Sequence, residues 1–271
     1  MDLSGVKLVV TDMDGTLLNA KGELNEEFPA IFHQLKEKNI RFAVASGRQY
    51  YSLVEKFRPV LDDLIFIAEN GAIVMEKSEE KFSMPMAREK AMEILEVVRD
   101  LGDKYLILCG KKAAYIEDTN PEFMNPFLQH YDKYEVVEDL TQVEDDEILK
   151  VTICDLAGAE QNSLPYVKHF ETDLQVKLSG EIWIDFTDKE AQKGNALSRV
   201  QQYYGISPQE TMVFGDYFND VEMFSQADFS FAMENAHEEV KPHARYKAAS
   251  NEEGGVEQVL RKLLEAVEPR N

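Results

Sequence analysis

The sequence predicts an α/β protein in which a doubly wound parallel sheet is interrupted by an inserted α+β module. Near both ends of the chain, short β-branched apolar runs alternate with helical patterns, an order typical of parallel sheets with right-handed crossovers. In the middle, short apolar runs follow one another closely, as they do in antiparallel hairpins. With 271 residues the chain is also longer than most single domains, so two packed units are expected.

Residues 1–84 form the first part of the predicted core. Its leading apolar run ends abruptly in two carboxylates, Asp12 and Asp14, after which Gly15 lets the backbone turn and Thr16 is expected to bond to nearby backbone groups. The later Asn70-Gly71 pair is a turn signal that favours a hairpin. The expected elements are strands over 6–11, 41–45 and 64–68, helices over 26–38 and 49–57, and a hairpin of 73–75 with 81–83.

The inserted module is expected over residues 85–187, where the rhythm of the sequence changes. Paired apolar runs joined by tight turns predict an antiparallel sheet with a few helices. The expected helices cover 87–101, 121–129 and 164–170, and the expected strands cover 105–109, 113–116, 147–154, 174–178 and 182–186.

The first rhythm returns in residues 188–271, which complete the predicted Rossmann-like core. A helical pattern starts at Lys193 and stops at Gly205, a residue that commonly ends helices. The expected elements are helices over 193–204, 220–226 and 256–267 and strands over 211–214 and 229–232.

Composition and charge narrow the possible partners. The formal net charge of −22 argues against nucleic acid and against anionic membrane surfaces, which bind basic patches. Cys109 and Cys154 lie in apolar runs and indicate no disulfide framework, and the N-terminal residues do not look like a signal peptide. We therefore expect a cytoplasmic protein that has no nucleic-acid or membrane partner; its oligomeric state is open.

Four loops that are distant in the chain are expected to meet at the carboxyl edge of the core sheet, where ligands bind in open α/β folds. Singly, each has an ordinary explanation as a turn, a solvated lysine or a helix cap. Together they provide what phosphoryl transfer needs: a nucleophile, an acid or base, oxygen ligands for a hard cation and donors for a phosphate. The residues concerned are Asp12 with Asp14, Ser46 with Gly47, Lys193, and Asp216 with Asn219 and Asp220.

This pattern resembles the haloacid dehalogenase-like (HAD) phosphatases, specifically the Cof-type branch with a large C2-type inserted cap. The match extends over nearly the whole core, whereas residues 85–187 carry no motif. One departure is the bulky Tyr217-Phe218 pair, where small residues are frequent in the family. The matching segments are Asp12-Met13-Asp14-Gly15-Thr16, Ser46-Gly47-Arg48, Glu69-Asn70-Gly71-Ala72, Lys193-Gly194, Gly215-Asp216-Tyr217-Phe218-Asn219-Asp220 and Met233-Glu234-Asn235-Ala236.

The resemblance implies a two-step hydrolysis of a small phosphorylated metabolite. Asp12 would be the nucleophile that forms an aspartyl-phosphate, and Asp14 would be the general acid and base. The implied metal is Mg²⁺, held by Asp12, the backbone carbonyl of Asp14 and Asp216, with Asp220 orienting metal-bound water. The implied phosphate-binding groups are Ser46, the Gly47 amide, Lys193 and Asn219.

Several other functions compete with this one. A cysteine phosphatase needs an arginine six residues after its nucleophile, but Tyr115 and Glu160 stand there, and no P-loop motif is present. A phosphosugar mutase of the same fold and a non-catalytic interaction protein remain as alternatives. The substrate is not readable from the sequence, although sugar phosphates are the expected class.

Overall fold

The computed structural model describes residues 1–267, and their contacts divide the chain into two compact units. The first unit comprises Met1–Gly47, Lys56–Phe82 and the chain from Gln192 onward. The second comprises Arg48–Glu55 and Ser83–Ala191. Each unit contains its own sheet, as the sequence predicts for a core with an inserted module.

Residues 48–55 group with the second unit, whereas the sequence analysis placed them in the first. The side chain of Gln49 donates a hydrogen bond to the Lys133 carbonyl (3.0 Å), and the Ser52 hydroxyl donates one to the His130 carbonyl (3.0 Å). A helical pattern alone does not reveal these partners, because it reports only which face of the helix is buried.

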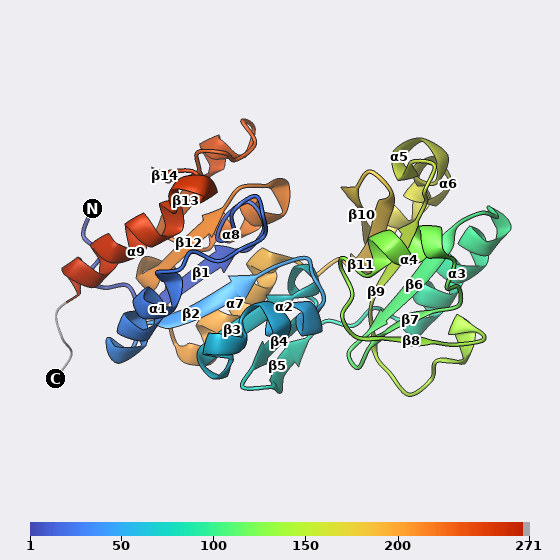
Figure 1. The fold of residues 1–271 in the computed structure, drawn as a ribbon, viewed down its shortest axis with the longest axis horizontal. Coiled ribbons are helices and arrows are strands. Elements are labelled where there is room, and N and C mark those ends of the chain that lie inside the picture. Colours follow the sequence, from blue (N-terminus) through green and yellow to red (C-terminus); the bar gives the residue numbers. More distant parts are fainter. Residues whose placement is uncertain (268–271) are drawn as a thin grey trace. The chain divides into compact units, whose positions relative to one another are not determined.

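The first unit is built on an eight-stranded sheet with the order β14-β13-β12-β1-β2-β3-β4-β5 (Figure 1). The pairs from β14 to β3 are parallel, and β4 turns back antiparallel to β3 after the predicted Asn-Gly turn. Doubly wound topology is therefore confirmed. The strands are β1 (Leu8–Asp12), β2 (Arg41–Ala45), β3 (Leu64–Ala68), β4 (Ile73–Glu76), β5 (Glu79–Ser83), β12 (Thr211–Gly215), β13 (Phe229–Met233) and β14 (Tyr246–Ala248).

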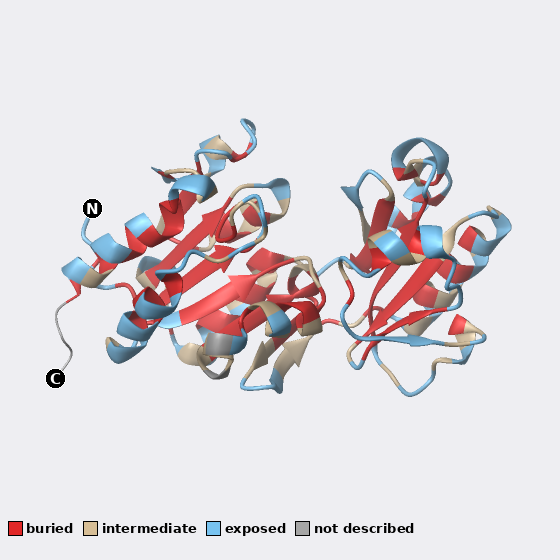
Figure 2. Ribbon diagram, in the orientation of Figure 1, coloured by how far each residue is buried: buried red, intermediate tan, exposed pale blue. Residues whose placement is uncertain are grey.

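Helices cover both faces of this sheet. Helix α1 (Phe28–Glu37) contacts α9 (Gly255–Ala266), and α7 (Lys193–Tyr204) contacts α8 (Val221–Ser225). Every residue of β1 and β3 is buried, which requires cover on both sides, and Figure 2 shows these central strands in red. The short helix α2 (Tyr50–Lys56) follows β2.

A six-stranded sheet in the order β10-β11-β9-β6-β7-β8 forms the second unit. Alternate side chains of strand β6 enter two apolar clusters, Leu106 and Leu108 on one face and Ile107 and Cys109 on the other. The elements are α3 (Arg88–Asp100), β6 (Tyr105–Gly110), β7 (Ala114–Ile116), α4 (Pro121–Phe127), β8 (Tyr134–Val136), β9 (Ile148–Cys154), α5 (Ala159–Asn162), α6 (Leu164–Val167), β10 (Leu174–Gly180) and β11 (Trp183–Asp188).

The sequence analysis missed the short edge strands β8 and β14. Both have three residues, those of β8 are all exposed, and neither shows the apolar signal of a buried strand. Because β8 pairs with β7 in parallel, the second sheet is mixed and not purely antiparallel. The expected helix over 164–170 is also interrupted: α6 ends at Val167, and a 3-10 helix follows over Lys168–Thr172. Within residues 1–267, no helix is both long and apolar enough to cross a membrane.

Candidate active site

The carboxyl ends of three neighbouring strands define the site. Asp12 is the last residue of β1 and pairs with Ala45 of β2, so Ser46 follows directly beside it. On the other side Thr11 pairs with Phe214 of β12, so the turn that carries Asp216 begins at the same level. Parallel pairing thus brings loops about 200 residues apart in the chain to one sheet edge.

Three carboxylates gather at this edge. Oxygens of Asp12, Asp216 and Asp220 all lie within 4.8 Å of one another. The Thr16 hydroxyl donates a hydrogen bond to Oδ1 of Asp216 (2.8 Å), which corrects the expectation that it bonds to backbone groups of its own turn. Gly15 has φ +79°, and a Cβ there would lie 2.5 Å from Oδ2 of Asp216, so only glycine permits this approach.

Lys193 lies between two of these acids. It starts helix α7, its side chain is fully buried, and Nζ lies 2.6 Å from Oδ1 of Asp12 and 2.7 Å from Oδ1 of Asp220. Burial alone lowers the lysine pKa, but the two carboxylates outweigh it, so the pKa is raised and the ammonium stays charged. The site therefore holds a permanent cation beside the predicted nucleophile.

Burial and mutual repulsion raise the pKa values of two of the three carboxyl groups. Burial raises the pKa of Asp12 well above its ordinary value, and repulsion from Asp220 and Asp216 adds to this effect while Lys193 opposes it. Burial and repulsion from Asp220 likewise raise the pKa of Asp216 to about 6. A bound cation would relieve this repulsion.

Both carboxylate oxygens of Asp220 accept hydrogen bonds from groups of the site. It is fully buried; Oδ1 accepts from Lys193, and Oδ2 accepts from the backbone amides of Asp216 (3.0 Å) and Tyr217 (3.1 Å). Because both oxygens have these partners, the geometry suits Asp220 to positioning Lys193 and the Asp216 turn.

The other predicted phosphate-binding residues lie on adjacent loops. Ser46 is buried, and its carbonyl accepts from the backbone amide of Asn70 (3.0 Å). The Asn219 side chain donates to Oδ1 of Asn70 (3.0 Å), and a Cβ on Gly47 would lie 3.0 Å from Nδ2 of the same asparagine. Asn70 thus links three of the four predicted phosphate-binding residues.

The sequence analysis gave Asn70 no role beyond its turn and its family segment. Its left-handed backbone, with φ 54° and ψ 28°, is the conformation that an Asn-Gly turn signals. Asn235 was passed over in the same way: its side chain donates to the Gly15 carbonyl (2.7 Å). The partners of Asn70 and Asn235 in these hydrogen bonds lie 149 and 220 residues away in the chain, so no local sequence pattern indicates these contacts.

Asp14 differs from the other acids. Its side chain is exposed, and it does not belong to the three-carboxylate cluster. An exposed carboxyl two residues after the buried Asp12 is accessible to a substrate. Asp14 is expected to bind the metal through its backbone carbonyl. The three-carboxylate cluster consists of side-chain oxygens only, so it does not include this atom.

The donors fit Mg²⁺. This ion prefers hard oxygen ligands and is commonly bound through one or two carboxylates together with substrate phosphate. Asp12 and Asp216 offer such oxygens, and burial together with repulsion from Asp220 raises the pKa of both carboxyls although Lys193 opposes the shift. Asp12, the Asp14 carbonyl and Asp216 are therefore the residues that would hold the ion.

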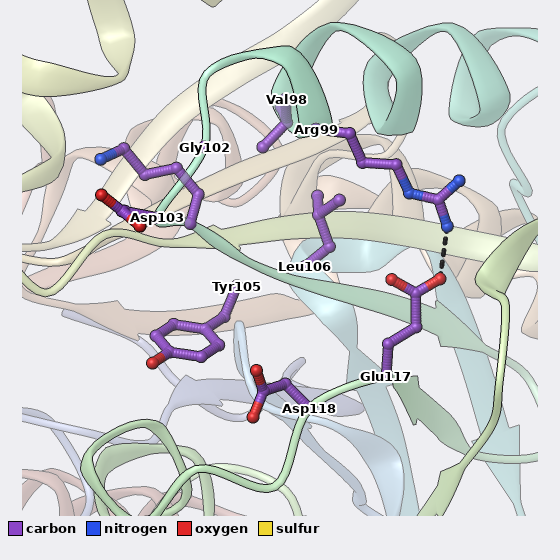
Figure 3. Close-up of a pocket in the computed structure, with 9 residues that line it drawn as sticks. Val98, Arg99, Gly102, Asp103, Tyr105, Leu106, Glu117 and Asp118 are labelled. Carbon is purple, nitrogen blue, oxygen red and sulfur yellow. Dashed lines mark hydrogen bonds and ion pairs between the residues drawn. The ribbon is translucent and has the colours of Figure 1, made fainter.

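A separate pocket of about 290 Å³ lies within the second unit, between the end of α3 and strand β6 (Figure 3). Arg99 points toward Glu117 and forms ion pairs with it and with Asp139. None of the predicted site residues lines this pocket, and its arginine already has two carboxylate partners, so we assign it no role in the chemistry.

Known proteins resemble this chain over nearly its whole length. The profile of the haloacid dehalogenase-like hydrolase family matches residues 9–260. Escherichia coli 5-amino-6-(5-phospho-D-ribitylamino)uracil phosphatase YbjI is 34% identical over 97% of this chain and 98% of its own length. Bacillus subtilis YcsE, which bears the same enzyme name, is 23% identical over 94% of this chain and 95% of its own.

A solved structure, SMU.1108c from Streptococcus mutans, superposes with a TM-score of 0.84 and 31% identity over 96% of this chain and 99% of its own. The family match extends from β1, which ends in Asp12, into α9. The chain therefore belongs to the haloacid dehalogenase-like hydrolase family.

Proposed function

We propose that the protein is a Mg²⁺-dependent phosphatase that hydrolyses small phosphomonoesters through an aspartyl-phosphate on Asp12. The broad class, hydrolysis of phosphoric monoesters, follows from the family and from curated phosphatases that match nearly the whole chain. The observation that carries the finer proposal is the buried Asp12–Lys193–Asp220 arrangement at the end of β1.

In the first step, an oxygen of the Asp12 carboxylate forms a bond to phosphorus while the bond to the leaving oxygen breaks. Asp14 supplies the proton that the leaving oxygen requires. Lys193 orients Asp12 through Oδ1 and places positive charge beside the phosphoryl group, whose negative charge must be stabilised during transfer.

In the second step, Asp14 removes a proton from water, the water oxygen bonds to phosphorus, and the Asp12–phosphorus bond breaks. The Asp12 carboxylate is restored and phosphate leaves. We assign the phosphate oxygens to Ser46, the Gly47 amide, Lys193 and Asn219. When bound, Mg²⁺ supplies positive charge that offsets repulsion between the phosphate and the carboxylates.

We assign the chemistry to the first unit, predicted as residues 1–84 and 188–271, and the choice of leaving group to the inserted unit, predicted as 85–187. The inserted sheet carries buried polar side chains that suit the binding of a polar leaving group. Lys150 lies 3.7 Å from Asp185, which accepts a hydrogen bond from Thr152 (2.6 Å). Lys150→Met should therefore change the ranking of substrates more than Lys90→Met, which removes a half-buried, paired lysine of the same unit.

For the substrate we propose a sugar or polyol phosphate. YbjI and YcsE are named as phosphatases of 5-amino-6-(5-phospho-D-ribitylamino)uracil, so this compound comes first among those to test. Because Cys109 and Cys154 are buried and form no disulfide within residues 1–267, we also propose that the enzyme works in a reducing compartment, the cytoplasm.

The nucleophile can be tested with Asp12→Asn, which keeps the shape of the side chain but removes the attacking charge. We expect phosphate release from an aryl phosphate to fall at least about 1,000-fold. Asp63→Asn is the matched control, since it alters another lysine-paired aspartate of the first unit. Activity of Asp12→Asn within about 10-fold of wild type would contradict the assignment. Transfer of the phosphate to a second position of a sugar, without release, would instead indicate a mutase.

A further inference from the structure

Two large aromatic side chains are exposed directly beside the candidate active site. Tyr217 and Phe218 immediately follow Asp216, and their exposed fractions are 56% and 45%. Adjacent exposed aromatic rings are an unusual surface for a turn that otherwise carries acids and asparagine, and exposed apolar patches commonly mark binding sites.

A third ring, that of His237, completes an aromatic cluster with Tyr217 and Phe218. The Phe218 and His237 ring centroids are 4.7 Å apart with the planes tilted by 49°. Tyr217 stands nearly perpendicular to both, at 5.2 Å from Phe218 and 6.3 Å from His237. The two contacts of Tyr217 are edge-to-face, an arrangement that aromatic pairs prefer, so the cluster is a preformed aromatic surface.

The aromatic cluster is tied to the same backbone that positions the carboxylates. The His237 amide donates to the Asp216 carbonyl (3.0 Å), and the Tyr217 amide donates to Oδ2 of Asp220 (3.1 Å). The Glu239 amide donates to Nδ1 of His237 (3.2 Å), which leaves the proton of a neutral imidazole on Nε2, where it can be donated to a ligand.

The strand order of the sheet indicates how far the aromatic cluster lies from the Asp12 loop. The rings lie on loops after β12 and β13, and β12 is next to β1 in the sheet. Since neighbouring strands are about 5 Å apart, the loop that carries Tyr217 and Phe218 starts about one strand spacing from the Asp12 loop, and the loop that carries His237 starts about two spacings away. A ligand that spans this distance needs a phosphate at one end and a flat apolar group on a short chain at the other.

We propose that the aromatic cluster binds a planar heterocycle in the leaving group of the substrate by stacking and edge contacts, with His237 as a hydrogen-bond donor. This inference rests on the proposed phosphatase function and specifies its substrate class, a heterocycle joined to its phosphate through a short polyol chain. It gives the first unit a share in selecting the leaving group, in addition to the selection assigned to the inserted unit. A sugar phosphate without a ring system of this kind would leave the three exposed rings without a ligand.

The test compares two phosphomonoesters that differ at one end of the polyol chain, which carries the amino-linked heterocycle in 5-amino-6-(5-phospho-D-ribitylamino)uracil and a hydroxyl in D-ribitol 5-phosphate. The readout is the ratio of their kcat/KM values for phosphate release. We expect wild type to favour the heterocyclic ester, and Tyr217→Leu and Phe218→Leu each to lower the ratio by about 10-fold.

Three matched variants separate stacking from other effects. Tyr217→Phe and Phe218→Tyr retain a ring and should keep the ratio. Tyr203→Leu removes a tyrosine of similar exposure, 59%, from helix α7 and should also leave it unchanged. Thermal unfolding of each variant checks that folding is retained, which the exposure of both rings favours.

The outcomes distinguish the inference from the function on which it rests. A wild-type ratio near one, a ratio unchanged in the leucine variants, or equal losses on both substrates would overturn the aromatic cluster as a heterocycle site, although phosphate release would still support the phosphatase. If wild type releases phosphate from neither ester nor from an aryl phosphate, the proposed function fails and the inference fails with it.

Discussion

Replacing Lys193 tests the electrostatics of the site most directly. In Lys193→Met the side chain keeps much of its volume but loses the ammonium that contacts Asp12 and Asp220. Both carboxylates are almost completely inaccessible to solvent, at 7% and 0% exposure, so water cannot replace the lost partner. Breaking a buried ion pair from one side typically costs about 3–5 kcal/mol of unfolding free energy.

This loss should appear as a lower melting temperature in metal-free buffer. For a protein of this size each kcal/mol shifts the midpoint by about 2–4 °C, which gives a drop of about 6–20 °C by scanning calorimetry. Lys36→Met is the matched control: Lys36 and Asp63 are 2.5 Å apart, but their side chains are 53% and 34% exposed. Exposed pairs contribute about 0–1 kcal/mol, so this variant should melt close to wild type.

The stability of Lys193→Met should also depend on pH with a definite sign. Burial already raises the pKa of Asp12, and removing the lysine removes the charge that opposes this shift. The folded variant then binds more protons than the unfolded chain, so its stability is retained below about pH 4 and lost as the pH rises. Adding Asp220→Asn should restore part of the loss. A Lys193→Met variant as stable as Lys36→Met across this range would refute the reasoning.

Two further predictions address the metal and a buried carboxyl outside the site. Phosphate release should stop in excess chelator and return with Mg²⁺, whereas Ca²⁺, with its larger and looser coordination shell, should restore little; full activity in chelator would contradict the metal assignment. Glu257 is 1% exposed, burial raises its pKa, and its Oε1 has no hydrogen-bond partner among residues 1–267. A folded-state pKa above the ordinary value means that stability is lost as the pH rises past about 4.5, so Glu257→Gln should become more stable than wild type toward pH 8 in urea unfolding. Parallel stability curves for the two proteins would show that Glu257 does not titrate in this way.

Much of the architecture could be predicted because its signals are local. The central strands of the core are short apolar runs that are buried on both faces. Such a strand can be predicted from its own residues, without knowing which strands it pairs with. The alternation of such runs with helices restricts the topology to a parallel, right-handed arrangement. That arrangement was sufficient to group the loops that carry Asp12, Lys193 and Asp216.

Elements without a local signal were not predicted. The three-residue strands β8 and β14 have exposed residues. They form because the edges of β7 and β13, respectively, provide backbone hydrogen-bond partners. The grouping of residues 48–55 with the second unit likewise depends on the partners of Gln49 and Ser52, which lie about 80 residues away in the chain.

The sequence by itself determined which residue types stand at the ends of the core strands, and hence the family and the chemistry to be expected. Only the tertiary structure decided how they pair: Thr16 with Asp216, Asn70 with Asn219, and His237 with Phe218. The physical reason is that burial produces a periodic pattern of apolar residues, and a turn a characteristic residue pair, within a short stretch of the chain. A hydrogen bond or ring contact instead depends on whether strand register brings two distant loops close together.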